Sequence, residues 1–183
     1  MSRTRIQQQG DLGQRAVCKY CICPKCKKGR LKQLIGGFKC ADVICDFCGF
    51  VAQVKAPAVR TASDRVLTIL GGAWKVQEEK LNAGIYHPLY IVKIVNGKPV
   101  AIDYIAADFL RPEMYVARKA LSAKARRAGW QGFIYDLRKL DDHVVVEVWP
   151  NLSPPKTETK PQTTDKSKGT EKQSIDTRLD RFR

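Results

Sequence analysis

The stretch FKCADVICDFCGFVAQVK, residues 38–55, decides the fold because it joins a metal-binding turn to the strand that follows it. Cys45-Asp-Phe-Cys48-Gly49 is a C-x-x-C turn, and its glycine permits the backbone bend that directs amide groups toward the thiolates. The runs on either side of this turn are predicted to pair as an antiparallel hairpin with a metal ion at its tip.

Three polar side chains around this hairpin are the candidate catalytic residues. In an antiparallel pairing centred on the turn, Asp42 lies opposite Ala52 or Gln53. Gln53 and Lys55 share one face because strand side chains alternate. An Asp carboxylate and a second oxygen suit Mg²⁺, which prefers oxygen ligands, and a lysine can position an attacking water or stabilise charge on a phosphate. The pattern predicts a site for phosphodiester hydrolysis, although a solvated hairpin face has the same pattern.

A second C-x-x-C pair, Cys23-Pro-Lys-Cys26, is separated from Cys45 and Cys48 by 18 residues. Four thiolates complete a closed tetrahedral site, which is the arrangement of structural zinc. Because such a site has no open position, the predicted Zn²⁺ stabilises the fold and takes no part in chemistry.

The upstream half of this zinc site has an alternative. Cys18-Lys-Tyr-Cys21 is also a C-x-x-C pair, and spacing alone does not decide between the two. Cys23 and Cys26 are preferred here because Pro24 suits the knuckle turn.

The charge of the chain indicates a polyanionic partner. Its 183 residues carry a formal net charge of +15, and Lys and Arg that displace counterions from phosphates drive nucleic-acid binding. There is no apolar run of roughly 18 residues and no basic amphipathic helix of the membrane type, so we expect no membrane partner. Nor do we expect a small-molecule cofactor. The N-terminal segment is polar, which predicts a cytoplasmic protein whose reduced cysteines favour metal over disulfides.

Composition divides the chain into three parts. We expect a polar, partly disordered lead-in over 1–17, an α/β domain over 18–149 and a disordered polar tail over 150–183, which has almost no apolar content. The elements expected after the cysteines are a helix within 66–81 that is either broken or started at Gly71-Gly72, strands over 89–95 and 99–105 joined by Asn96-Gly97, a short helix or loop over 112–120, and strands over 133–137 and 144–149.

Three motifs along the chain stand out together. The first is Cys23-Pro-Lys-Cys26 followed by Asp42, the second cysteine pair and Val54-Lys55. The second is Gly72-Ala-Trp74. The third and most specific is Ala-Arg-Arg-Ala-Gly-Trp-x-Gly over 125–132, followed by Asp136-Leu137. Together these motifs resemble the catalytic domain of the DpnI-type restriction endonucleases, which include the Dam-replacing proteins, over about residues 20–140 with order and spacing kept.

This resemblance implies a PD-(D/E)xK restriction-endonuclease-like α/β fold, a mixed sheet flanked by helices with an inserted four-cysteine zinc knuckle. It implies that Asp42 and Gln53 hold Mg²⁺ and that Lys55 is the catalytic lysine. The family has glutamate where this chain has Gln53, so one negative charge at the metal site is lost. The loop containing Arg126, Arg127 and Trp130 is implied to meet DNA. Arginine forks can bind phosphates or guanine edges, and an apolar ring can contact a methyl group in the major groove.

The function expected from these residues is Mg²⁺-dependent hydrolysis of double-stranded DNA, in the manner of type II restriction at GATC sites with N6-methyladenine. The alternative is a catalytically inactive, zinc-dependent DNA-binding protein on the same fold, in which Gln53 marks a decayed site. A zinc-ribbon protein that binds RNA accounts for the charge and cysteines but leaves the arginine–tryptophan loop unexplained.

Overall fold

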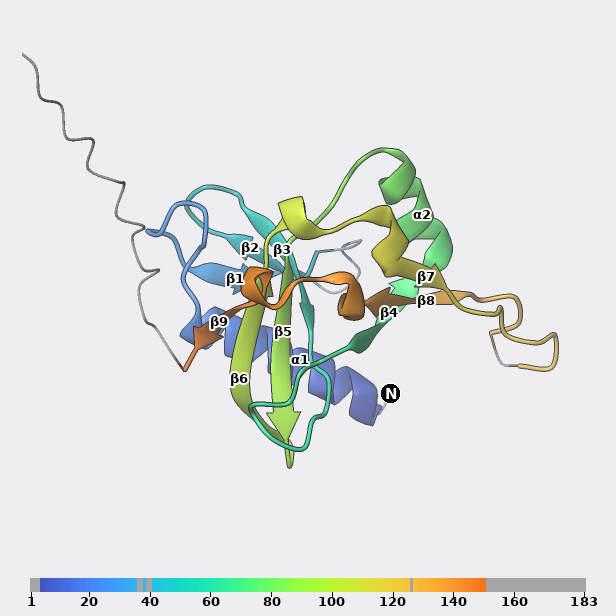
Figure 1. The fold of residues 1–183 in the computed structure, drawn as a ribbon, viewed down its shortest axis with the longest axis horizontal. Coiled ribbons are helices and arrows are strands. Elements are labelled where there is room, and N and C mark those ends of the chain that lie inside the picture. Colours follow the sequence, from blue (N-terminus) through green and yellow to red (C-terminus); the bar gives the residue numbers. More distant parts are fainter. Residues whose placement is uncertain (1–3, 36–37, 39–40, 126, 151–183) are drawn as a thin grey trace, which may run out of the picture. The chain divides into compact units, whose positions relative to one another are not determined.

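The computed structural model describes residues 4–35, 38, 41–125 and 127–150, all within one compact unit, Met1–Leu152. A second unit, Ser153–Arg183, lies wholly outside the described residues, as does the predicted tail beyond Pro150. The helices and strands, shown in Figure 1, are α1 (Arg5–Tyr20), β1 (Leu31–Gln33), β2 (Val43–Cys45), β3 (Val51–Lys55), β4 (Thr68–Ala73), α2 (Trp74–Asn82), β5 (Leu89–Val95), β6 (Lys98–Ile105), β7 (Tyr115–Ala117), β8 (Gly132–Asp136) and β9 (Val146–Trp149). Four short 3₁₀ turns complete the described part: Ala107–Phe109, Pro112–Met114, Leu137–Lys139 and Asp142–Val144.

The main sheet has six strands in the order β1-β2-β3-β5-β6-β9. Only β3 and β5 run parallel among the paired strands described, and the remaining pairs are antiparallel. A smaller sheet has the order β4-β8-β7. The predicted α/β class, a mixed sheet with helices beside it, is therefore confirmed.

Helix α1 covers one face of the main sheet, where it lies against β1, β3, β5 and β6 (Figure 1). Its buried residues Gly13, Ala16 and Val17 pack into the first core, which also contains Ala52 and Val54 of β3. A Cβ at Gly13 would lie 2.7 Å from the Ala56 Cβ, so this glycine lets the helix approach the sheet closely.

The expectation of a partly disordered lead-in over 1–17 did not include the helix that its residues from Arg5 onward form. The helix begins with a capping box in which Thr4 accepts a hydrogen bond from the Gln7 backbone N–H and the Gln7 side chain accepts one from the Thr4 N–H. Its sequence is polar and includes Gly10 and Gly13, which argue against a helix in isolation. Packing of a short apolar stripe against the sheet supplies the stabilisation that local propensity lacks.

The second core lies between the other face of the main sheet and the small sheet. Leu89 and Ile91 of β5 meet Phe133 and Tyr135 of β8 there, together with Tyr115 of β7. The aromatic rings form a tilted cluster with centroids 4.9 Å apart for Phe133 and Tyr135 and 5.8 Å apart for Tyr115 and Phe133.

Of the two alternatives for residues 66–81, the structure contradicts the broken helix and has a helix that starts after the glycines. Residues 68–73 form strand β4, which pairs antiparallel with β8 through Ile69 and Tyr135, and helix α2 begins at Trp74. A Cβ at Gly71 would overlap the Phe133 ring, so this glycine permits the sheet to pack and does not interrupt a helix. The strand partner lies more than 60 residues downstream, where helical periodicity gives no sign of it.

Other expected elements agree with the structure or shift by a few residues. Asn96 and Gly97 have φ angles of 49° and 76°, the left-handed conformations that the predicted two-residue hairpin between β5 and β6 requires. The expected short helix or loop at 112–120 is a 3₁₀ turn followed by β7, and the last strand begins at Val146.

Candidate functional site

Four cysteines meet at the tip of the β2–β3 hairpin. The sulfur atoms of Cys23, Cys26, Cys45 and Cys48 all lie within 4.8 Å of one another. The Cys23 and Cys48 sulfurs are 3.6 Å apart, and those of Cys26 and Cys45 are 3.7 Å apart. A tetrahedral zinc site with Zn–S bonds of about 2.3 Å places its sulfurs roughly 3.8 Å apart. The cluster therefore has the geometry to bind zinc.

The two cysteine pairs occupy matching turns. The residue after each pair has a left-handed backbone, with φ of 58° at Lys27 and 69° at Gly49. Backbone N–H groups point at the sulfurs: Gly29 N lies 3.3 Å from Cys26 Sγ, and Phe47 N lies 3.4 Å from Cys45 Sγ. These are the knuckle turns expected from the sequence. Within the part of the chain that the structure describes, the group does not include Cys18 or Cys21.

The protein environment acts oppositely on two thiols of this cluster. Backbone N–H groups of Gly29 and Lys28 lower the pKa of Cys26 to about 6, whereas burial raises the pKa of Cys23 to about 12. A zinc ion requires all of its cysteine ligands as thiolates, so loading of this cluster releases protons and is favoured as pH rises.

Asp42 lies at the start of β2, level with Gln53 in the register that pairs Val43 with Ala52. Its backbone N–H donates to the Ala52 carbonyl over 2.9 Å, which extends the β2–β3 ladder. Its carboxylate Oδ2 accepts the Val54 backbone N–H at 2.8 Å, and Oδ1 accepts the Gln14 side-chain amide at 3.2 Å. The carboxylate is thus fixed against the strand segment between Gln53 and Lys55.

Gln53 and Lys55 lie on the opposite face of β3 from its core residues Ala52 and Val54. Both contact Tyr135: the tyrosine hydroxyl donates a hydrogen bond to Gln53 Oε1, and the Lys55 Nζ lies 6.0 Å from the ring centroid. Tyr135 comes from β8, so the small sheet holds both candidate residues. Sequence reasoning missed this contact, because it joins positions 82 residues apart.

The oxygen donors here suit Mg²⁺ in type. Magnesium is commonly held by one or two carboxylates with waters and substrate phosphates, and Asp42 supplies one carboxylate while Gln53 supplies an amide oxygen. All three of these oxygens already accept one hydrogen bond each, from Val54, Gln14 and Tyr135. An oxygen of this kind has a second lone pair, so the donors fit the ion, with one charge fewer than two carboxylates.

The loop between β7 and β8 carries the arginine–tryptophan motif. Arg127 stacks its guanidinium over the Trp130 ring at 4.6 Å from the ring centroid, and the backbone N–H of Trp130 donates to the Arg127 carbonyl at 3.0 Å. Gly129 has φ of 74°, which closes this turn. Arg126 lies outside the described residues. The loop and Tyr135 share one hairpin, so the candidate DNA contact is joined directly to the candidate active site.

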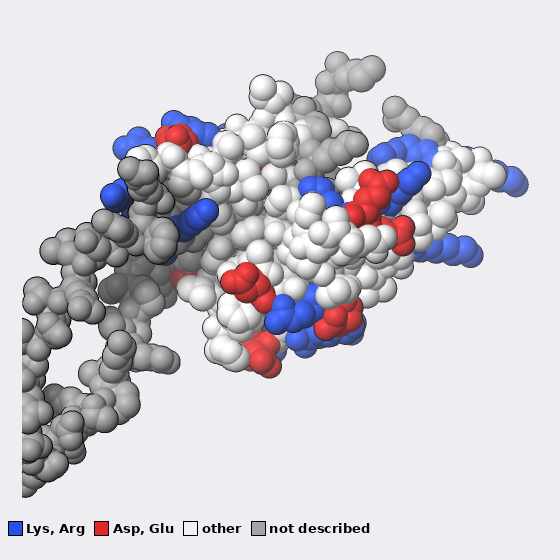
Figure 2. Space-filling model, turned by 90° about the horizontal axis from the view of Figure 1, so that it is seen from above, with Lys and Arg blue, Asp and Glu red and all other residues white. Residues whose placement is uncertain are grey.

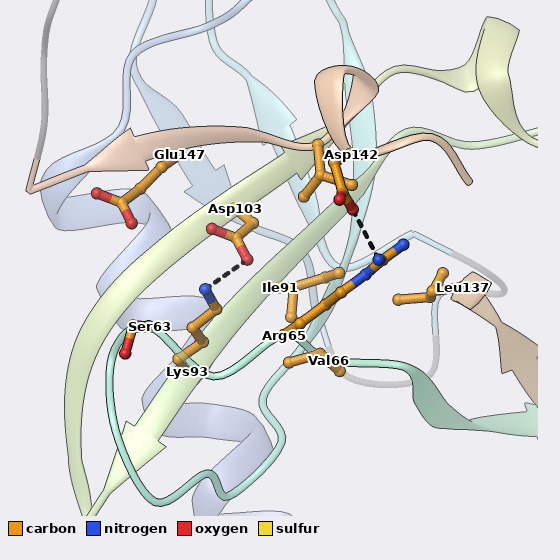
Figure 3. Close-up of a pocket in the computed structure, with 10 residues that line it drawn as sticks. Ser63, Arg65, Val66, Ile91, Lys93, Asp103, Leu137, Asp142 and Glu147 are labelled. Carbon is orange, nitrogen blue, oxygen red and sulfur yellow. Dashed lines mark ion pairs between the residues drawn. The ribbon is translucent and has the colours of Figure 1, made fainter. Parts of the chain in front are cut away.

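A separate polar cavity of about 350 Å³ lies beside β5 and β6 (Figure 3). Lys93 and Asp103 point toward each other there, with Nζ and Oδ2 3.0 Å apart and side chains 8% and 9% exposed. Burial raises the pKa of Asp103, and Lys93 opposes that rise. Glu147 from β9 also lines the cavity and is the register partner of Asp103. None of the predicted site residues lines it.

On the face shown in Figure 2, basic side chains lie at both ends and also beside the acidic side chains between them. Most acidic side chains on that face lie between them. None of the described helices combines the length and apolar character that a membrane crossing requires.

The chain was compared with known proteins. A family model described as "DpnI: Dam-replacing family" matches residues 3–164. No curated protein matches the chain.

Proposed function

Because the chain belongs to the Dam-replacing family of DpnI, we propose that it is a Mg²⁺-dependent endodeoxyribonuclease that cuts double-stranded DNA at GATC sites carrying N6-methyladenine. One observation carries this proposal. The Asp42 carboxylate is bonded to the backbone of β3 between Gln53 and Lys55, and these three residues have the order and spacing of the family's catalytic set.

In the proposed reaction Asp42 and Gln53 hold the metal ion through their oxygens. When bound, Mg²⁺ lowers the pKa of a water molecule and stabilises charge on the phosphate. Lys55 orients the attacking water or stabilises the negative charge that develops on the phosphate oxygens. Tyr135 holds the Gln53 side chain through its hydroxyl, and its ring lies beside the Lys55 ammonium group.

DNA recognition is assigned to the β7–β8 loop. Arg126 and Arg127 bind phosphates or guanine edges, and the Trp130 ring contacts the adenine methyl group in the major groove. We also propose that Cys23, Cys26, Cys45 and Cys48 bind one Zn²⁺, which fixes the hairpin from which Asp42 and Lys55 project.

The experiment is cleavage of plasmid DNA with Mg²⁺, with and without N6-methyladenine at GATC. Wild-type protein is expected to cut only the methylated plasmid, and Asp42→Asn is expected to abolish cutting without loss of DNA binding. Cutting by Asp42→Asn at the wild-type rate would show that the catalytic assignment is wrong. Equal cutting of both plasmids would remove the methyl dependence and leave a nuclease of other specificity.

A second candidate function is that of a DNA-binding protein without catalysis. It is favoured by the Tyr135 hydroxyl, which donates to the one oxygen that Gln53 can offer a metal, and by the missing charge at that position. It predicts salt-sensitive DNA binding with no cutting at any Mg²⁺ or Mn²⁺ concentration.

Two variants separate these candidates. Gln53→Glu restores the carboxylate, and Tyr135→Phe removes the competing hydroxyl while the ring stays. If wild-type protein is inactive and Gln53→Glu cuts, the chain is a decayed nuclease. If wild-type protein cuts, Gln53→Glu is expected to lower the Mg²⁺ concentration needed for half-maximal rate.

A further inference from the structure

A groove of about 440 Å³ runs between helix α1 and strand β1. Part of its lining comes from α1, and the rest comes from β1 and the residue directly before it. The lining residues are Arg15, Cys18, Lys19, Arg30, Leu31, Lys32 and Gln33. Four of these seven residues carry a positive charge, and none of the acidic residues that the structure describes lines the groove. Arg15, Lys19, Arg30 and Lys32 are all exposed, so their charged groups are accessible to a ligand.

One carboxylate lies at the edge of this groove. Asp46 Oδ2 is 3.8 Å from the Lys32 Nζ, and its Oδ1 accepts the Arg30 backbone N–H at 2.9 Å. Asp46 therefore offsets part of the charge of Lys32. An exposed ion pair of this kind is weak, so most of the positive charge remains available to an anion.

The groove is connected to the candidate active site by two side-chain amides. Gln33, which lines the groove, donates from Nε2 to Gln14 Oε1 at 2.5 Å. Gln14 in turn donates from Nε2 to Asp42 Oδ1 at 3.2 Å. Two consecutive hydrogen bonds therefore link the groove lining to the Asp42 carboxylate.

The spacing of the cations matches a nucleic-acid backbone. Arg15 and Lys19 are four residues apart on a helix, which is about 6 Å along its axis, and Arg30 and Lys32 are two residues apart along an extended chain, about 6.6 Å. DNA carries one phosphate per strand for about every 3.4 Å of its axis, and neighbouring phosphates lie farther apart than this rise because the strand winds around the axis. Each pair of cations can therefore contact two neighbouring phosphates of one strand.

We propose that this groove binds the phosphate backbone of duplex DNA beside the cleavage site. The inference rests on the proposed function, since it assigns to DNA a path that starts at Asp42. Phosphate contacts carry no sequence information and position the duplex. The groove thus sets the register of the DNA strand over Asp42, while the β7–β8 loop reads the bases.

The test compares a groove variant with a variant of equal charge change elsewhere. Arg15→Gln/Arg30→Gln removes two exposed groove cations that belong to neither hydrophobic core, and Arg60→Gln/Lys98→Gln removes two exposed cations outside the groove. The fluorescence anisotropy of a labelled duplex is measured across salt concentrations, with methylated and unmethylated GATC sites and with an RNA duplex of the same length.

The groove variant is expected to weaken binding of both DNA duplexes equally. It should also reduce the slope of log K against log salt by about 2, because each lost phosphate contact removes about 1. The control variant should leave the slope at the wild-type value. A slope that is unchanged in the groove variant, or reduced as much in the control, would overturn the proposal.

Preferential binding of the RNA duplex through the same two arginines would also overturn the assignment to DNA. The binding readout is independent of catalysis. If wild-type protein cuts no DNA but the groove variant still reduces the slope of log K against log salt, the proposed nuclease function is wrong while DNA binding by the groove is supported. If wild-type protein cuts DNA and the slope of the groove variant does not change, DNA binding by the groove is wrong while the nuclease function is supported.

Discussion

The two faces of strand β3 carry out different tasks with alternate residues of the same five-residue segment. On one face Ala52 and Val54 pack beneath α1, in a core that also contains Cys23 and Cys45 of the cysteine cluster. On the other face Gln53 and Lys55 are only half-buried and contact Tyr135.

This difference shows how a short strand can be stably packed on one face and still present polar side chains to a ligand on the other. Apolar burial and the cysteine cluster at the hairpin tip stabilise the face toward α1, whereas the face toward β8 keeps polar groups accessible to a ligand. Substitutions on the first face should therefore act on stability, and substitutions on the second on activity.

Removal of metal from the cysteine cluster should have the largest effect. Structural zinc contributes about 10–16 kcal/mol in small domains, which equals or exceeds the usual total stability of about 5–15 kcal/mol. Chelation, or Cys48→Ser, is expected to release one zinc per chain and unfold the α1 side of β3, as measured by metal analysis and circular dichroism. Cys18→Ser is the matched control and should retain both metal and fold. A metal-free protein with an unchanged melting curve would refute the zinc assignment.

Lys55→Met tests the accessible face. It removes the ammonium group but keeps the length of the side chain, so cleavage of methylated DNA should fall by about 10²-fold or more. The melting temperature should stay near that of wild-type protein, and Lys98→Met serves as the control for loss of one positive charge. A large loss of stability in Lys55→Met would show that the two faces are not separable in this way.

Val54→Ala tests the neighbouring position on the core face. Val54 is 6% exposed, and loss of two buried methyl groups should cost about 2 kcal/mol of unfolding free energy. Urea denaturation should show this loss, whereas the cleavage rate at a temperature where the variant stays folded should match wild-type protein. Reduced cleavage by a fully folded Val54→Ala protein would contradict the division between the faces.

The smallest effect concerns pH and the end of β8, the strand that supports the active face. Arg138 holds the pKa of Asp136 below its ordinary value by donating from Nε and Nη2 at 2.7 and 2.8 Å. The unfolded chain therefore binds a proton at a pH where the folded chain does not. This contribution to stability is present above about pH 4 and is lost as the pH falls through the folded pKa. Asp136→Asn keeps an acceptor for the Arg138 N–H and should remove this acid dependence, which pH-resolved melting curves would detect.

Much of the hairpin could be predicted from local sequence. The C-x-x-C turns, Gly49 and the alternation along residues 51–55 act over a few residues, and the structure has the hairpin with Asp42 level with Gln53. The same holds for the β5–β6 hairpin, because Asn96-Gly97 specifies its turn by backbone conformation alone.

Helix α1 and strand β4 could not be predicted in the same way. The helix is polar and contains two glycines, and it is stable where Gly13 allows contact with the sheet. Strand β4 has mixed periodicity and becomes a strand because β8 pairs with it. In both cases the deciding partner is distant in the chain.

By itself the sequence determined the cysteine pairs, the catalytic triplet as a candidate, the basic charge and the family resemblance, because these depend on residue type and short spacing. The tertiary structure alone decided that Cys23 and Cys26, and not Cys18 and Cys21, meet the second pair. It also decided that Tyr135 supports Gln53 and that four cations line one groove beside α1. These features depend on packing between segments that are far apart in the chain. Local sequence preferences leave several backbone conformations nearly equal in free energy, and burial and sheet pairing stabilise one of them.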